Sequence, residues 1–122
     1  KDLLDVHLPR VEVEWIRQAI HDRGKVICGF HDLRTRKAGH FRFVEFHLKV
    51  EPRMTVLDSH AIAKELSRRI KEQFPYTTVT IHIEPCDGEC LEKCVAGCLL
   101  PEEKRRRTRG GQETMTAPAS RG

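Results

Sequence analysis

The chain has 122 residues, which is enough for one small soluble domain with a single hydrophobic core. No stretch holds 18 consecutive apolar residues and the first residues lack the apolar core of a signal peptide, so neither a membrane span nor a secretion signal is expected. Because the first residue is Lys rather than Met, we expect a fragment or a processed product. The formal net charge is +4, but residues 100–122 hold six basic and three acidic side chains, so the basic character belongs to a tail.

Two helices are predicted by apolar residues that recur at helical spacing. The first starts at Pro9, whose fixed φ suits a helix start, and stops at Gly24. The second is capped by Thr55 and ends before Pro75. Residues 1–8 are interpreted as a linker that enters the domain.

Three strands are predicted from alternating apolar and polar side chains. Residues 25–36 form the first, a turn occupies residues 37–40, residues 41–51 form the second, and residues 78–84 form the third. The order is therefore α-β-β-α-β, within residues 9–86. This order favours an α+β fold of two layers, in which both helices cover one face of a small sheet.

The same alternation places candidate metal ligands on the sheet face that the helices leave uncovered. Because the apolar side chains must face the helices, His47 faces the other way, as do His82 and Glu84 in the third strand. Side chains two positions apart in a strand lie about 6.5–7 Å apart, so they can reach one ion or an adjacent pair. His31 lies in the first strand, and His60 lies in the first turn of the second helix, where it can reach past the rim.

Several imidazoles and one carboxylate form a ligand set for a borderline-soft divalent cation. Zinc suits this set best, and iron, manganese, nickel and cadmium are further candidates. A carboxylate can bridge two ions, so a binuclear site is feasible. The alternative is that these are ordinary polar residues of an exposed sheet face, where histidines are common. Three outward-facing ligand residues on two strands favour the metal interpretation.

Short motifs across residues 7–86 carry a resemblance to a known family. In chain order they are Leu8-Pro9, Ile16-Arg17-Gln18-Ala19-Ile20, His31-Asp32-Leu33-Arg34-Thr35-Arg36, His47, Ser59-His60-Ala61-Ile62-Ala63 and Ile81-His82-Ile83-Glu84-Pro85. In combination they resemble the cytoplasmic C-terminal domain of cation diffusion facilitator transporters. The resemblance implies a metallochaperone-like, ferredoxin-like domain that forms a V-shaped homodimer on the cytoplasmic side of the cell inner membrane. In bacterial members, zinc near the dimer interface is thought to regulate transport.

The resemblance also assigns roles to individual positions. His31, His47, His60 and His82 match metal ligands of the family. Glu84 stands where matching members usually have Asp, and its longer side chain is expected to alter the geometry with which the carboxylate bridges two ions. The family transports ions through a transmembrane part upstream, so the implied partners are a second copy of the chain and that part. No nucleic acid, small-molecule substrate or catalytic residue is implied. We expect metal binding to close the dimer. The alternative is that the chain is a stand-alone soluble metal-binding protein.

Residues 87–100 are interpreted as a cysteine-rich extension, and residues 101–122 as a disordered basic tail. An odd cysteine count without a secretion signal fits thiols in a reducing compartment. On a helix, cysteines spaced by four would share one stripe, because each step turns the side chain by about 40°. A second soft-metal site is therefore a candidate, formed by Cys86, Cys90, Cys94 and Cys98. The alternative is apolar packing of the tail, since a free cysteine behaves as a small hydrophobe.

Two other classes of protein compete with the metal-binding interpretation. The run Phe41-Arg42-Phe43-Val44-Glu45-Phe46 resembles the aromatic strand of an RNA-recognition motif. That motif has a small residue where Arg42 stands and begins with a strand, both of which disfavour RNA binding. A metal-dependent hydrolase could use the histidines to activate water, but a domain of this size has little room for a substrate pocket.

Overall fold

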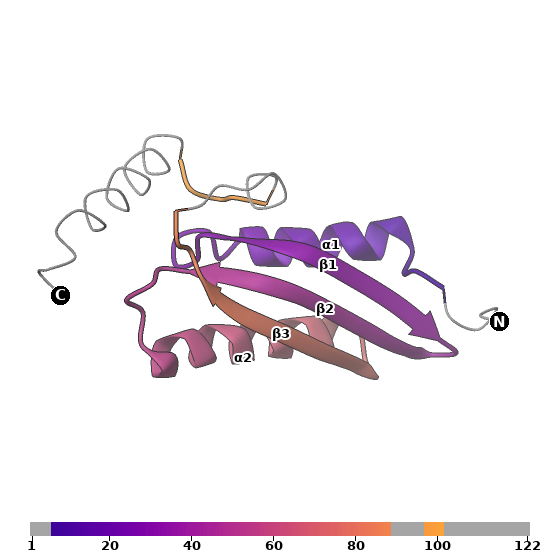
Figure 1. The fold of residues 1–122 in the computed structure, drawn as a ribbon. Coiled ribbons are helices and arrows are strands. Elements are labelled where there is room, and N and C mark those ends of the chain that lie inside the picture. Colours follow the sequence, from indigo (N-terminus) through magenta and orange to yellow (C-terminus); the bar gives the residue numbers. More distant parts are fainter. Residues whose placement is uncertain (1–5, 89–96, 102–122) are drawn as a thin grey trace, which may run out of the picture.

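The computed structural model describes residues 6–88 and 97–101. Five elements follow one another: α1 (Arg10–His21), β1 (Gly29–Ala38), β2 (Phe41–Val50), α2 (Val56–Gln73) and β3 (Thr77–Pro85). Figure 1 shows the two helices on one face of the sheet. The α+β fold and the α-β-β-α-β order predicted from the sequence are confirmed. No helix in the described part of the chain is long and apolar enough to cross a membrane.

Both helices start where the sequence predicts, and the first is shorter than predicted. Pro9 occupies the N-cap of α1 with φ −56°. The helix ends at His21 rather than at Gly24, because the next residues turn instead, with the Val26 N–H donating to the carbonyl of Arg23 at 3.0 Å. In α2, the hydroxyl of Thr55 accepts from the Asp58 N–H at 3.0 Å, as a capping residue does.

The first strand lies further along the chain than predicted. It spans Gly29–Ala38 rather than residues 25–36, since the preceding residues are used by the turn after α1. Strand pairing continues to Ala38 opposite Phe41, so the connecting turn is only Gly39 and His40. Gly39 has φ +64°, the left-handed conformation that glycine adopts at no steric cost. The second strand ends at Val50, one residue before the predicted end.

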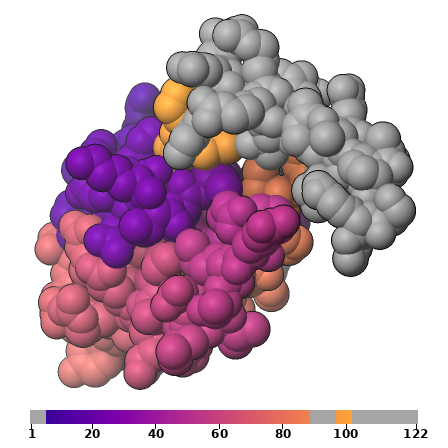
Figure 2. All heavy atoms as spheres, turned by 90° about the vertical axis from the view of Figure 1, so that its left-hand side faces the viewer, coloured from indigo at the N-terminus to yellow at the C-terminus, as the bar shows by residue number. Residues whose placement is uncertain are grey.

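The central strand of the sheet is β2. It pairs antiparallel with β1 and parallel with β3. The chain therefore crosses from β2 to the neighbouring parallel strand β3 through α2. Figure 2 shows the end of the molecule at which β2 stops. In this view the helices α1 and α2 lie on one side and the end of β3 lies on the other. The core lies between the layers, and its fully buried large side chains are Phe46, Ile16, Ile20, Leu48, Leu66, Ile70 and Val44.

Candidate metal centre

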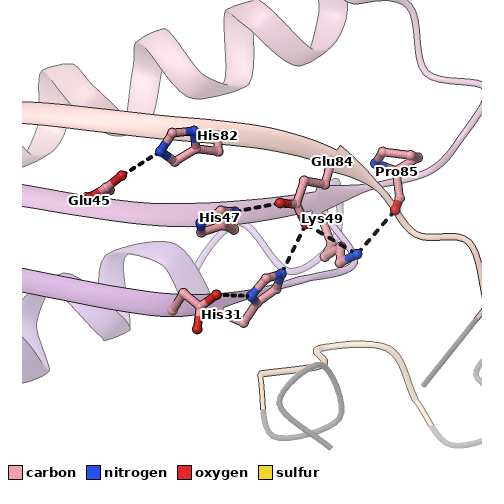
Figure 3. A network of polar contacts seen from close by, with 8 residues as sticks. His31, Glu45, His47, Lys49, His82, Glu84 and Pro85 are labelled. Carbon is pink, nitrogen blue, oxygen red and sulfur yellow. Dashed lines mark hydrogen bonds and ion pairs between the residues drawn. The ribbon is translucent and has the colours of Figure 1, made fainter. Parts of the chain in front are cut away.

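Three histidines form a row across the open face of the sheet. His31 in β1 pairs with His47 in β2, and His47 pairs with His82 in β3. The rings of His31 and His47 stack with centroids 5.0 Å apart, and those of His47 and His82 with centroids 4.6 Å apart. Figure 3 shows the three rings side by side with Glu84. Strand register thus places residues from three distant parts of the sequence on one line.

A bulge in β1 allows the row of histidines and the neighbouring Arg34 to share this face of the sheet. The register shifts between His31 and Arg34, so that His31 pairs with His47 while Arg34 pairs with Glu45. One extra residue is therefore inserted, and Asp32 takes φ +56°. A regular strand would turn His31 and Arg34 to opposite faces. The sequence analysis missed this bulge.

Glu84 joins two of the histidines. The imidazole of His47 donates through Nδ1 to Oε2 at 2.5 Å, and Nε2 of His31 lies 3.1 Å from Oε1. The ammonium of Lys49 lies 3.4 Å from the same Oε1. The three side chains of His31, His47 and Glu84 each offer a ligand atom within 4.8 Å of the others. Among the described residues, they are the group of three that can hold one metal ion.

The electrostatics keep this carboxylate ionised. Burial by itself would raise the pKa of Glu84, but hydrogen bonds from His47 and His31 outweigh it and lower the pKa to about 2. A hydrogen bond from His82, whose Nε2 lies 2.6 Å from Oε2 of Glu45, likewise lowers the pKa of Glu45. Ionised carboxylates beside imidazole nitrogens are the ligand types that zinc takes.

The network makes the stability of the metal-free chain depend on pH. Because the pKa of Glu84 is about 2 when folded and the ordinary value is 4.5, Glu84 contributes stability that is present above pH 4.5 and lost as the pH falls toward 2. We expect chemical denaturation in chelator to show a steeper loss of unfolding free energy over this window for wild type than for Glu84→Gln. Equal slopes for the two proteins would contradict the network.

The arrangement around His31 fits a metal ligand. Its Nδ1 lies 3.1 Å from Oδ2 of Asp32, while Nε2 points at Glu84. A ligating imidazole usually donates its second ring N–H to a carboxylate, which fixes the ring and makes the free nitrogen a better ligand. Asp32 supplies that carboxylate from the bulge. The sequence analysis did not single out Asp32, although the residue stands directly beside His31 in the motif.

Two predicted ligands lie outside the group of three. His82 is stacked on His47, but its Nε2 contacts Glu45 instead of Glu84. His60 is exposed on α2, which packs on the other face of the sheet. Within one chain, the sheet therefore separates His60 from the row formed by His31, His47 and His82.

The cysteines are arranged differently from the predicted four-residue spacing. Cys90 and Cys94 lie outside the described residues. Cys98 forms a β-bridge with Gly29, so a helical stripe of cysteines does not extend to Cys98. Cys86 lies directly after β3, where its N–H donates to the carbonyl of Val50 at 2.8 Å. A hydrogen bond from the Cys28 thiol, followed by one from the Gly88 N–H, lowers the pKa of Cys86 to about 6 against the opposing effect of burial.

The fold and this cluster define the chain as a small α+β domain with a histidine–carboxylate site on its open sheet face. A family model described as the cytoplasmic domain of cation efflux proteins matches residues 8–86, and the chain belongs to this family. The resemblance to cation diffusion facilitators is thereby confirmed. The family's function is cation efflux, which is transport rather than conventional enzyme chemistry.

Curated relatives and solved structures agree with this membership. The cation-efflux pump FieF of Yersinia pestis (strain Pestoides F) is 37% identical over 86 residues, which are 70% of this chain and 28% of that pump. The structure of the zinc form of the putative zinc transporter CzrB is 42% identical, with TM-score 0.59, covering 68% of this chain and 93% of that one. The metal-bound C-terminal domain of the CzcD transporter from Thermotoga maritima is 26% identical, with TM-score 0.55 and coverage of 64% and 94%.

Proposed function

We propose that this chain is the metal-sensing regulatory and dimerisation domain of a divalent metal efflux transporter. The observation that carries the proposal is the convergence of His31, His47 and Glu84 on one point, with Asp32 behind His31. Zinc is the proposed ion, because two imidazoles and a carboxylate suit its tetrahedral geometry and leave one position open. On binding, the ion would replace the hydrogen bonds to Glu84, and the ammonium of Lys49 would move away from the added positive charge.

A second ion is proposed beside the first. Glu84 has two carboxylate oxygens, and His82 lies next to His47, so Glu84 can bridge an ion held by His31 and His47 to one held by His82. His60 is exposed on α2, on the other side of the sheet from the row, so a role for it as a ligand would need a second copy of the chain. Iron, manganese, nickel and cadmium remain alternative ions, since imidazole and carboxylate ligands accept them as well.

The setting of the domain is proposed from its relatives. The chain spans 28% of the length of the FieF pump that it matches. We propose that residues 1–8 link it to a transmembrane transporter part and that it lies on the cytoplasmic side of the inner membrane. The CzrB zinc form and the metal-bound CzcD domain support the assignment of a metal-binding role to this fold. Residues 87–100 and 101–122 are proposed as an extension and a tail beyond the metal-binding domain.

Zinc titration calorimetry tests the site. We expect wild type to bind zinc at micromolar concentrations or tighter, and His82→Ala to lose the second ion or bind it far more weakly. Removing a ligand should cost at least the roughly 10–100-fold that outer-shell changes cost. Affinity should fall as the solution is acidified, because protons compete with the ion for the ligating nitrogens.

The matched control is His40→Ala, which removes an exposed histidine from the turn between β1 and β2, away from the row. This variant should bind zinc as wild type does. Equal stoichiometry and affinity in wild type and His82→Ala would refute the role of His82. Loss of binding in His40→Ala alone would place the site elsewhere.

A further inference from the structure

Three aromatic rings lie exposed at the end of the sheet where β2 begins. Phe41 is 49% exposed, and Tyr76, directly before β3, is 68% exposed. Their ring centroids are 6.0 Å apart, and the ring of His40 lies 4.5 Å from Phe41 and 5.2 Å from Tyr76. Tyr76 takes φ +62°, which is rare for a bulky residue, and its carbonyl accepts from the Arg42 N–H at 3.0 Å. The rings are therefore held together in solvent rather than in the core, which marks this end of the sheet as a contact surface.

The chain enters the domain at the same end. Val6, which is 52% exposed, forms a β-bridge with Lys37, and its N–H donates to the Lys37 carbonyl at 3.1 Å. Figure 1 shows the N-terminal segment beside the turn between β1 and β2 and near the start of β3. In the proposed function, on which this inference rests, residues 1–8 lead to a transmembrane part. The end that carries the aromatic rings is then the end of the domain nearest the bilayer.

Basic side chains gather at this end of the domain. The segments 6–10, 36–42 and 71–76 contribute Arg10, Arg36, Lys37, Arg42 and Lys71. Two acidic side chains in or beside these segments are paired, since Glu12 accepts from Arg42 at 3.0 Å and Glu72 lies 2.9 Å from Arg68. Within these segments positive charge is therefore in excess. Aromatic rings at headgroup depth and basic side chains on lipid phosphates are how proteins contact an anionic membrane surface.

We propose that this aromatic tip, formed by Val6, His40, Phe41 and Tyr76, docks on the surface of an anionic lipid bilayer. The rings and Val6 enter the headgroup region, and the basic side chains bind lipid phosphates. A second copy of the chain is a poorer occupant, because two positively charged ends that face each other repel. The metal centre stands on the same strand, since His47 lies six positions from Phe41 along β2, or about 20 Å at about 3.3 Å per residue. Docking of the tip therefore holds the metal centre at a fixed distance from the bilayer.

Co-sedimentation of the chain with lipid vesicles tests the tip. The vesicles contain phosphatidylglycerol and phosphatidylcholine in equal parts, and vesicles of phosphatidylcholine alone serve for comparison. Phe41→Thr with Tyr76→Asn should lower the vesicle partition coefficient about tenfold or more, because burial of the two rings is lost. Both replacements suit their sites, since threonine favours a strand and asparagine tolerates the left-handed conformation of Tyr76. Wild type should bind the anionic vesicles more tightly than the uncharged ones, and less tightly as salt is added.

The matched control removes two exposed apolar side chains from the other end of the domain. Val56 and Leu57, which are 83% and 76% exposed, begin α2 after the end of β2. Val56→Thr with Leu57→Gln should bind the vesicles as wild type does. The basic residues 104–107 attract anionic lipid in all three proteins, so only the difference between wild type and each variant is read. Equal binding by wild type and by Phe41→Thr with Tyr76→Asn overturns the proposal and leaves a protein surface as the cover of the tip.

Zinc calorimetry on the same proteins separates the membrane contact from the metal site. Phe41→Thr with Tyr76→Asn should bind zinc as wild type does, because neither side chain belongs to the row of histidines. An unchanged zinc affinity also shows that the variant is folded, so its loss of vesicle binding is then assigned to the tip. Zinc binding by wild type without vesicle binding refutes the membrane contact alone, whereas vesicle binding without zinc binding refutes the metal site alone.

Discussion

Adding zinc to the chelator-treated protein should reduce the radius of gyration of the proposed homodimer in small-angle X-ray scattering. We propose that two copies contact each other beside the open sheet face and that metal draws them together. To reverse an open-to-closed ratio from about 10:1 to about 1:10, zinc must prefer the closed state about a hundredfold, or about 2.7 kcal/mol. Two coordination bonds made only in the closed state, for example by His60 of a second copy, would supply this preference.

The charges on the open sheet face bear on why metal would close the dimer. Repulsion between acidic groups on facing subunits would by itself hold a metal-free dimer open. The open face in fact carries both signs, because Arg34 lies opposite Glu45 and Lys49 lies beside Glu84. Charge repulsion between carboxylates is therefore largely cancelled within each chain. The shared metal–ligand bonds remain as the source of the preference.

The control for this experiment removes the ligands and keeps the fold. His47→Ala with His82→Ala should show the same radius of gyration with and without zinc, because both side chains lie on the solvent-facing side of the sheet. A smaller radius in wild type that persists in this double variant would point to zinc acting elsewhere. An unchanged profile of wild type at saturating zinc would reduce the site to a structural or storage role.

Phe46→Ala should destabilise the chain by about 3–5 kcal/mol in equilibrium chemical denaturation. Phe46 is fully buried in β2 and its ring meets that of Phe30 edge-on, with centroids 6.5 Å apart. Truncation removes the buried ring and leaves a cavity that the strand cannot close. Because Phe46 precedes His47, loss of packing there should also weaken metal binding by disordering the row of histidines.

The matched control is Phe41→Ala, the same change five positions earlier in the same strand. Phe41 is 49% exposed and contacts His40 and Tyr76 at the end of the sheet, so its truncation should cost about 1 kcal/mol or less. Similar losses for the two variants would mean that the core is not centred on β2. A far larger loss for Phe46→Ala supports the two-layer packing.

Sequence patterns were sufficient for the elements and for most of the site. Alternation in β2 and β3 placed His47, His82 and Glu84 on one face, because side chains of a strand must alternate when one face is buried. The resemblance to cation diffusion facilitators matched His31 and His60, which were already candidates, to metal ligands of the family. Element ends were less well predicted, and β1 began at Gly29 because the turn after α1 uses the residues before it.

By itself, the sequence determined the order of helices and strands, the buried face of each and the family of the chain. These depend on local periodicity and capping, which neighbouring residues set. The tertiary structure alone decided which side chains meet. The bulge at Asp32 and the register of three strands brought His31, His47 and Glu84 together. Such contacts follow from strand pairing between distant segments, and spacing along the chain carries no record of that pairing.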